Sequence, residues 1–227
     1  MKIETLDHVA LWVSGRDEPA DFLVRHLGMH VIDRTDNFTL VGADARRGKL
    51  TLFEADGERE PGVLARVGFR VFDLGEALAD LPADLDVERT SPGVARFAAP
   101  GGLPLELLEV ERGVAYDLDH VLFRVPDPDA SRAAFAELGF APEDGRLRAG
   151  DAYVAFEPGE PRETERPLLN HLGLRVESTD RHIEEAKRRG LEIADVVDAA
   201  NTYAVFVWGP DGIKLEYVEH KASFSLA

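Results

Sequence analysis

Two histidines and one glutamate in the second half of the chain occupy positions at which a metal could be bound. His120 and His171 lie near the starts of segments that alternate apolar with other residues, and Glu216 lies in a similar segment near the C-terminus. Alternation of this kind is typical of a β-strand with one buried face. Two imidazoles and one carboxylate are the ligand set of non-haem iron(II) sites, which leave coordination positions open. The sequence therefore predicts a metal site at His120, His171 and Glu216.

These three positions belong to an internal repeat. The segment around His8 resembles those around His120 and His171, and a fourth copy has Arg66 in place of the histidine. Predicted helices follow at residues 19–27, 74–81, 130–138 and 179–189, and closing strands at 49–54, 103–109, 152–157 and 213–219. A helix and about three strands follow each first strand. The chain is therefore predicted to be an α+β protein of four βαβββ modules.

The two halves of the chain look like copies of each other. Nearly equal offsets separate His8 from His120, Arg66 from His171 and Glu106 from Glu216. We therefore expect two similar halves, 1–112 and 115–227, each a curved mixed sheet around a cavity with helices outside, and a hinge at 111–114. In the N-terminal half the site is degenerate, because Arg66 is expected to form an ion pair with Glu106.

The run that leads into Glu216 carries a recognisable signature. Residues 206–216 read Phe-Val-Trp-Gly-Pro-Asp-Gly-Ile-Lys-Leu-Glu. With the four modules, this run resembles the vicinal oxygen chelate superfamily of glyoxalase I, bleomycin resistance proteins and extradiol dioxygenases, and is most similar in layout to two-domain extradiol ring-cleavage dioxygenases. The resemblance implies an oxidoreductase that binds a vicinal diol or similar oxygen pair together with dioxygen. Its divalent metal would be Fe(II) as the first choice, with Mn(II) or Zn(II) as alternatives.

The chain departs from the extradiol pattern beside the predicted site. Phe206 stands where the family has a tyrosine, and the run ending at Asn201 lacks the family's histidine. The catalytic residue therefore stays unassigned, with Asn201 and Tyr203 as candidates. Tyr203, Phe206 and Arg175 are expected to line the substrate pocket. Histidines outside the repeated positions, such as His220, are expected on the surface.

Two alternatives stay open within the same superfamily. One is a metal-dependent lyase or isomerase of the glyoxalase type, which would need a second carboxylate where Thr51 and Val154 replace the first glutamate of the closing strands. Glu157 could supply that carboxylate only through a strand shift. The other alternative is a protein that binds a small molecule, such as an antibiotic, without turnover.

Composition narrows the classes of partner. The 227 residues include 26 Lys plus Arg and 43 Asp plus Glu, which gives a net charge of −17, and no cysteine. The negative charge argues against nucleic acid and anionic membranes as partners, because binding to phosphate requires Lys and Arg. Without cysteine, any metal must be bound by nitrogen and oxygen ligands. We expect a cytoplasmic protein with a small-molecule substrate, and a homo-oligomer is one conceivable assembly.

Overall fold

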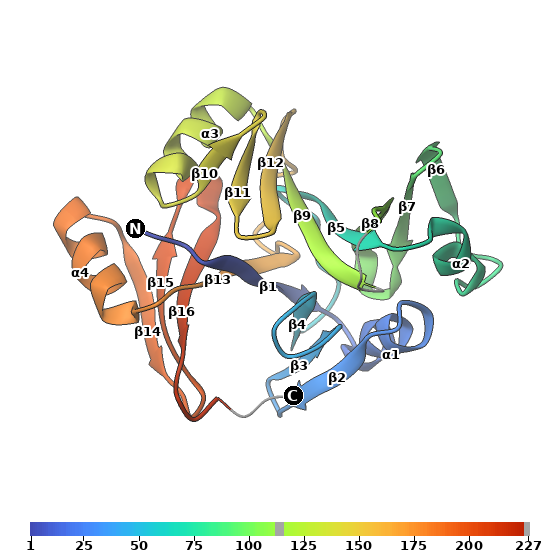
Figure 1. Ribbon diagram of the computed structural model, residues 1–227, viewed down its shortest axis with the longest axis horizontal. Coiled ribbons are helices and arrows are strands. Elements are labelled where there is room, and N and C mark those ends of the chain that lie inside the picture. The colour runs from blue at the N-terminus through green and yellow to red at the C-terminus, as the bar shows by residue number, and fades with distance from the viewer. Residues whose placement is uncertain (112–115, 225–227) are drawn as a thin grey trace.

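The computed structural model describes residues 1–111 and 116–224, which form four βαβββ modules (Figure 1). The first module comprises β1 (Thr5–Val13), α1 (Asp17–His26), β2 (His30–Arg34), β3 (Phe38–Gly42) and β4 (Lys49–Glu54). The second comprises β5 (Leu64–Val71), α2 (Leu74–Ala79), β6 (Val87–Ser91), β7 (Val94–Ala99), the short helix η1 (Pro100–Gly102) and β8 (Leu103–Glu109).

The third and fourth modules repeat this order. The third comprises β9 (Tyr116–Val125), α3 (Pro128–Glu137), β10 (Ala141–Glu143), β11 (Arg146–Ala149) and β12 (Ala152–Pro158). The fourth comprises β13 (Leu169–Arg175), α4 (Thr179–Arg189), β14 (Ile193–Asp198), β15 (Thr202–Trp208), the short helix η2 (Pro210–Gly212) and β16 (Lys214–His220). The predicted α+β class and its four modules are confirmed.

The modules combine into sheets differently from the expected grouping. The first sheet has the strand order β14-β15-β16-β13-β1-β4-β3-β2, so module four joins module one. The second sheet has the order β10-β11-β12-β9-β5-β8-β7-β6, so module three joins module two. The expectation that residues 1–112 and 115–227 each form their own sheet is therefore wrong. Residues 112–115, which include most of the predicted hinge, lie outside the described residues.

The first strands of the modules hold each sheet together. β1 runs antiparallel to β13, and β5 runs antiparallel to β9. Two connecting segments cross between the sheets side by side, because the backbone N–H of Glu60 donates to the carbonyl of Arg166 and that of Leu168 donates to the carbonyl of Glu60. The chain thus leaves the first sheet after module one and returns to it for module four (Figure 1).

Local sequence signals account for the helices. Asp127 caps α3 by accepting hydrogen bonds from the backbone N–H groups of the first turn, and Pro128 occupies the first turn, where a missing N–H costs nothing. Gly190 ends α4 with a φ of +67°, a left-handed conformation that favours glycine. Within β16, Leu215 and Tyr217 are fully buried in the core. The alternate residues of that strand face the opposite side of the sheet.

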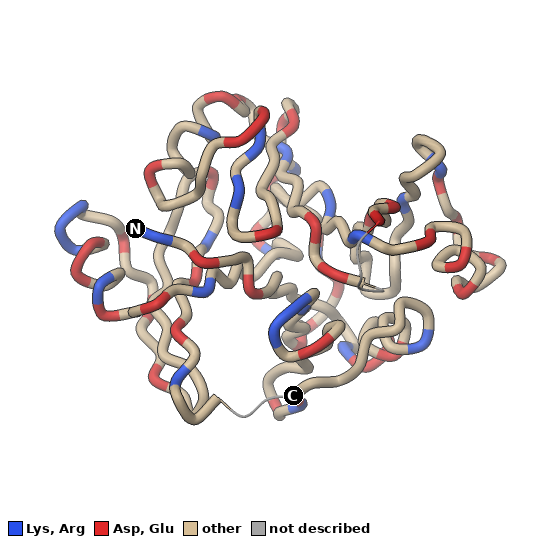
Figure 2. The backbone as a smooth tube through the Cα atoms, in the orientation of Figure 1, with Lys and Arg blue, Asp and Glu red and all other residues tan. Residues whose placement is uncertain are grey.

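Charged residues are spread over the whole structure. Figure 2 shows Asp and Glu along both sheets, interspersed with Lys and Arg. Among the described residues, no helix is long and apolar enough to span a membrane.

Candidate metal centre

Three potential ligand atoms converge in the first sheet. His8 Nε2 lies 3.1 Å from His171 Nε2, and Glu216 Oε2 lies 3.1 Å from each of these nitrogens. The side chains are nearly buried, with exposed fractions of 12% for His8, 5% for His171 and 10% for Glu216. We call these three residues the ligand cluster. The structure thus brings together two of the predicted ligands, His171 and Glu216, and adds His8 as the third.

The strand register explains why these side chains meet. In the antiparallel β1–β13 pair, His8 lies opposite Gly173, and in the parallel β13–β16 pair Glu216 lies beside the same glycine. A Cβ at Gly173 would come within 2.2 Å of the His8 ring. The absence of a side chain there therefore lets the imidazole lie across β13 and approach Glu216.

Both imidazoles are oriented by a neighbour on their own strand. His8 Nδ1 lies 2.9 Å from Asp7 Oδ2, and His171 Nδ1 lies 3.0 Å from Asn170 Oδ1. Because both partners are acceptor oxygens, each Nδ1 donates a proton and each Nε2 faces the cluster. Lys49 holds Asp7 through a buried ion pair of 2.8 Å. Carboxylate-histidine pairs of this kind are a common outer shell of metal sites.

The cluster is strongly polarised when no metal neutralises it. Burial alone would lower the pKa of His8, but Asp7 and Glu216 raise that pKa to about 9. Burial alone would raise the pKa of Glu216, but the two imidazoles lower it to about 2. Burial lowers the pKa of His171. In the metal-free chain His8 is therefore cationic and Glu216 anionic near neutral pH, and the two form an ion pair of 3.1 Å where the ligand atoms meet.

The ligand atoms fit a divalent metal. Ligand bonds of roughly 2.1 Å place atoms that are 3.1 Å apart at nearly right angles, as on one face of an octahedron. Glu216 Oε2 is buried and accepts no hydrogen bond of good geometry among the described residues. Such an oxygen beside two imidazole nitrogens is a donor set that a cation would satisfy.

His120 lies outside this cluster, which corrects its predicted place. It belongs to the second sheet, where its Nε2 lies 3.4 Å from Glu106 Oε1. Arg66 Nε lies 3.5 Å and Arg96 Nε 2.5 Å from the other oxygen of Glu106. The expected ion pair between Arg66 and Glu106 is confirmed. Gly68 leaves room for the His120 ring as Gly173 does for the His8 ring, so the two sheets carry equivalent sites. In the second sheet the guanidinium of Arg66 occupies the place that corresponds to His171.

The position of a fourth ligand is occupied by a residue that lacks a carboxylate. Glu216 pairs with Gly173, which follows His171 on β13 by two residues. In the same way Thr51 pairs with Ala10, which follows His8 on β1 by two residues. In module three the equivalent residue is Ala155, which pairs with Leu122, two residues after His120. The expectation that Val154 occupies the position equivalent to Thr51 is therefore wrong by one residue.

Glu157 cannot replace the missing carboxylate. Its oxygens lie in the second sheet, 3.1 Å from Arg66 and 2.6 Å from Arg124. The strand shift that would bring it to the ligand cluster is excluded by this sheet assignment. The cluster therefore offers one carboxylate and two imidazoles.

A cavity of about 1080 Å³ opens in front of the ligand cluster. Phe206 and Asn201 line it, as expected for the pocket and for a catalytic candidate. Tyr203 does not, because it lies on the opposite face of β15 and its hydroxyl donates to Asp180. Arg175 forms an ion pair of 2.9 Å with Glu4 at the end of its strand, away from the cavity wall.

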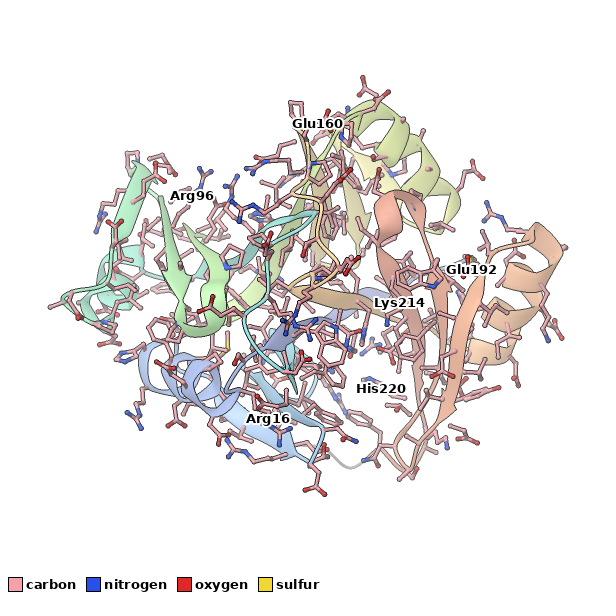
Figure 3. All side chains as sticks on the ribbon, turned by 180° about the vertical axis from the view of Figure 1, so that it is seen from behind. Arg16, Arg96, Glu160, Glu192, Lys214 and His220 are labelled. Carbon is pink, nitrogen blue, oxygen red and sulfur yellow. The ribbon has the colours of Figure 1, made fainter. Side chains whose placement is uncertain are left out.

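Two further residues line the cavity although the sequence analysis did not assign them to the site. His220 was expected on the surface, but its Nε2 lies 3.3 Å from Asp7 Oδ1 and its side chain is 14% exposed. Lys214 also lines the cavity. Both share the alternation of β16 with Glu216, at even spacing, and that signal could have found them. Figure 3 labels Lys214 and His220, which lie along the strands of the fourth module.

Comparison with known proteins supports the predicted resemblance. The family model described as "Glyoxalase/Bleomycin resistance protein/Dioxygenase superfamily" matches residues 5–84, which span module one and the first strand and helix of module two. This match confirms the predicted superfamily over that segment. No curated protein matches the chain.

Solved structures share the fold over nearly the whole chain. A putative dioxygenase from Bacillus subtilis has a TM-score of 0.78 at 16% identity, covering 98% of this chain and 87% of that one. Glyoxalase I from Zea mays has a TM-score of 0.75 at 16% identity, covering 95% and 92%. The cppA protein from Streptococcus pneumoniae has a TM-score of 0.67 at 14% identity, covering 96% and 100%. At these identities the likeness establishes the fold.

Proposed function

We propose that this chain, whose residues 5–84 match the glyoxalase, bleomycin resistance and dioxygenase superfamily, is a metal-dependent oxidoreductase. His8, His171 and Glu216 would bind a divalent metal, with Fe(II) as the first choice and Mn(II) or Zn(II) as alternatives. The substrate would be a vicinal diol or a similar oxygen pair, oxidised with dioxygen. The observation that carries the proposal is the 3.1 Å triangle of two imidazole nitrogens and one carboxylate oxygen beside a cavity.

The chain's own residues prepare this site. A bound metal would supply Lewis acidity, which lowers the pKa of a diol and favours its binding as an anion. Asp7 and Asn170 keep the Nε2 atoms of the two histidines directed at the metal position. Phe206 and Phe53 flank the His171 ring, at centroid distances of 5.1 and 6.2 Å, and limit the access of water.

The ligand set favours an oxidoreductase over a glyoxalase-type lyase or isomerase. That second chemistry would use another carboxylate as ligand and base. Thr51 occupies its register position, and Glu157 is paired with arginines in the other sheet. A site with three protein ligands leaves more positions for a diol and dioxygen.

A second candidate is the binding of a small molecule without turnover. The cavity of about 1080 Å³ supports it, because sites for drug-sized ligands have volumes of about 300–1,000 Å³ and this one is slightly larger. An antibiotic or a molecule of similar size would fit such a space.

Elemental analysis of purified variants tests the proposed ligands. The wild type and the His120→Ala variant should carry about one equivalent of metal, while His8→Ala and His171→Ala should lose it. His120→Ala is the matched control, since His120 occupies the equivalent place in the second sheet. Retention of metal by His171→Ala would contradict the proposal, and so would metal-free wild type that fails to take up Fe(II), Mn(II) or Zn(II).

Oxygen consumption then separates the candidate functions. The Fe(II)-loaded protein should consume dioxygen with at least one diol from a catechol panel. Thermal stabilisation by a diol without oxygen uptake would favour the binding protein. Turnover of a substrate without oxygen uptake would favour the lyase or isomerase.

A further inference from the structure

Lys214 brings a positive charge into the cavity without an anionic partner. It lies two residues before Glu216 on the same face of β16, and the intervening Leu215 is buried in the core. Within residues 1–111 and 116–224, no carboxylate oxygen lies within ion-pair distance of its Nζ. The other cavity lysine, Lys49, is already paired with Asp7 at 2.8 Å. Lys214 is therefore the lysine of this cavity that can receive a ligand.

Aromatic rings connect this ammonium group to the ligand cluster. Lys214 Nζ lies 5.8 Å from the centroid of Phe206 and 5.6 Å from that of Trp208. The Phe206 ring in turn packs edge-on against His171, with 5.1 Å between the centroids. These contacts hold the charge against an apolar wall that ends at the metal ligands. A planar aromatic molecule lying along this wall would reach both.

The surroundings of Lys214 favour an anionic ligand group. The Lys214 side chain is partly buried, with its ammonium against the rings of Phe206 and Trp208. A partly desolvated ammonium gains from a charge-assisted hydrogen bond with a carboxylate. Asp195 and Glu192 also line the cavity and would attract a cationic ligand instead. The test must therefore distinguish an anionic from a cationic ligand.

The aromatic contacts limit the distance that a ligand must span. Because Lys214 Nζ lies 5.8 Å from the Phe206 centroid and that centroid lies 5.1 Å from the His171 ring, Nζ is no more than about 11 Å from His171. One aromatic ring with a diol at one end and a carboxylate at the other can bridge this distance, once the bonds to a metal and to the ammonium are included. We propose that the cavity binds an aromatic vicinal diol that carries a carboxylate, with the diol at the ligand cluster and the carboxylate on Lys214. The position of the diol rests on the proposed function.

Binding of three matched probes tests this assignment. Protocatechuate carries a carboxylate, 4-methylcatechol carries a methyl group at the same ring position, and the aminomethyl analogue carries a cation. Titration calorimetry with the Zn(II)-loaded chain should show protocatechuate binding about tenfold or more tightly than 4-methylcatechol. Lys214→Met should abolish that preference and leave the affinity for 4-methylcatechol nearly unchanged.

Two further variants keep the test specific. Lys214→Arg retains the charge and should keep most of the preference, while Lys187→Met, on the exposed face of α4, should behave as the wild type. Equal affinities for the acid and the methyl analogue would overturn the assignment. So would tighter binding of the aminomethyl analogue, or failure of every diol to bind. Because zinc-loaded protein is used, the preference is measured independently of oxygen uptake, and a failed dioxygenase assay would leave it standing.

Discussion

Substitution of Gly173 provides a sharp test of the ligand cluster. A Cβ at this position would lie 2.2 Å from the His8 ring, whereas ordinary contacts of a Cβ begin near 3.4 Å. In Gly173→Ala the imidazole must therefore move by about 1 Å, which is enough to misalign a metal ligand. Because His8 is one of the three proposed ligands, we expect metal affinity to fall by about 100-fold or more.

The second sheet supplies a matched control for this substitution. A Cβ at Gly68 would lie 2.3 Å from the His120 ring, so Gly68→Ala introduces the same clash at the equivalent place. Overpacking should cost both variants about 1–3 kcal/mol in the free energy of unfolding. Competition with a chromophoric chelator measures zinc affinity, and urea unfolding of the metal-free proteins measures stability. Equal metal affinities for Gly173→Ala and Gly68→Ala would refute the assignment of His8 as a ligand.

Three further predictions concern charge and ligand number at the same site. In the metal-free protein, Asp7 and Glu216 raise the pKa of His8 from 6.5 to about 9. The protonated imidazole therefore stabilises the folded state fully below pH 6.5, and this contribution is lost as the pH rises through 9. The free energies of urea unfolding near pH 6 and pH 10 should differ by up to about 3 kcal/mol, and His8→Gln should remove this difference. Lys49→Met leaves Asp7 buried without its cation and should lower stability by about 3 kcal/mol, and an unchanged melting temperature would contradict the buried ion pair. Thr51→Glu adds a carboxylate at the position on β4 that corresponds to Glu216 on β16. Zinc affinity, measured by competition with a chelator, should rise by about tenfold. An unchanged affinity would mean that residue 51 does not reach the metal.

Local patterns were sufficient to predict the modules and the strands that hold His171 and Glu216. Alternation locates strands, and glycines such as Gly190 mark helix ends, because both signals depend on neighbouring residues only. The alternation also places Lys214, Glu216 and His220 on one face of β16. The same rule puts Tyr203 and Phe206 on opposite faces of β15, since they are three residues apart, so Tyr203 could have been excluded from the pocket.

The pairing of modules could not be predicted in this way. The first strands of all four modules have similar alternation, and an antiparallel partner for β1 can be β5, β9 or β13 without violating any local rule. The choice depends on contacts between distant segments, such as Glu60 with Arg166 and Leu168. For this reason local patterns group His120 with His171, whereas in the structure His8 lies beside His171. Gly68 and Gly173 mark β5 and β13 as strands that face an imidazole, but both glycines have the same local pattern, so they do not say which histidine each strand meets.

Anomalous X-ray scattering from a crystal of the iron- or zinc-loaded chain tests the central claim most directly. We predict a single strong peak at the point shared by His8 Nε2, His171 Nε2 and Glu216 Oε2. A peak between His120 and Glu106, or a fully loaded protein without a peak at the ligand cluster, would contradict the claim.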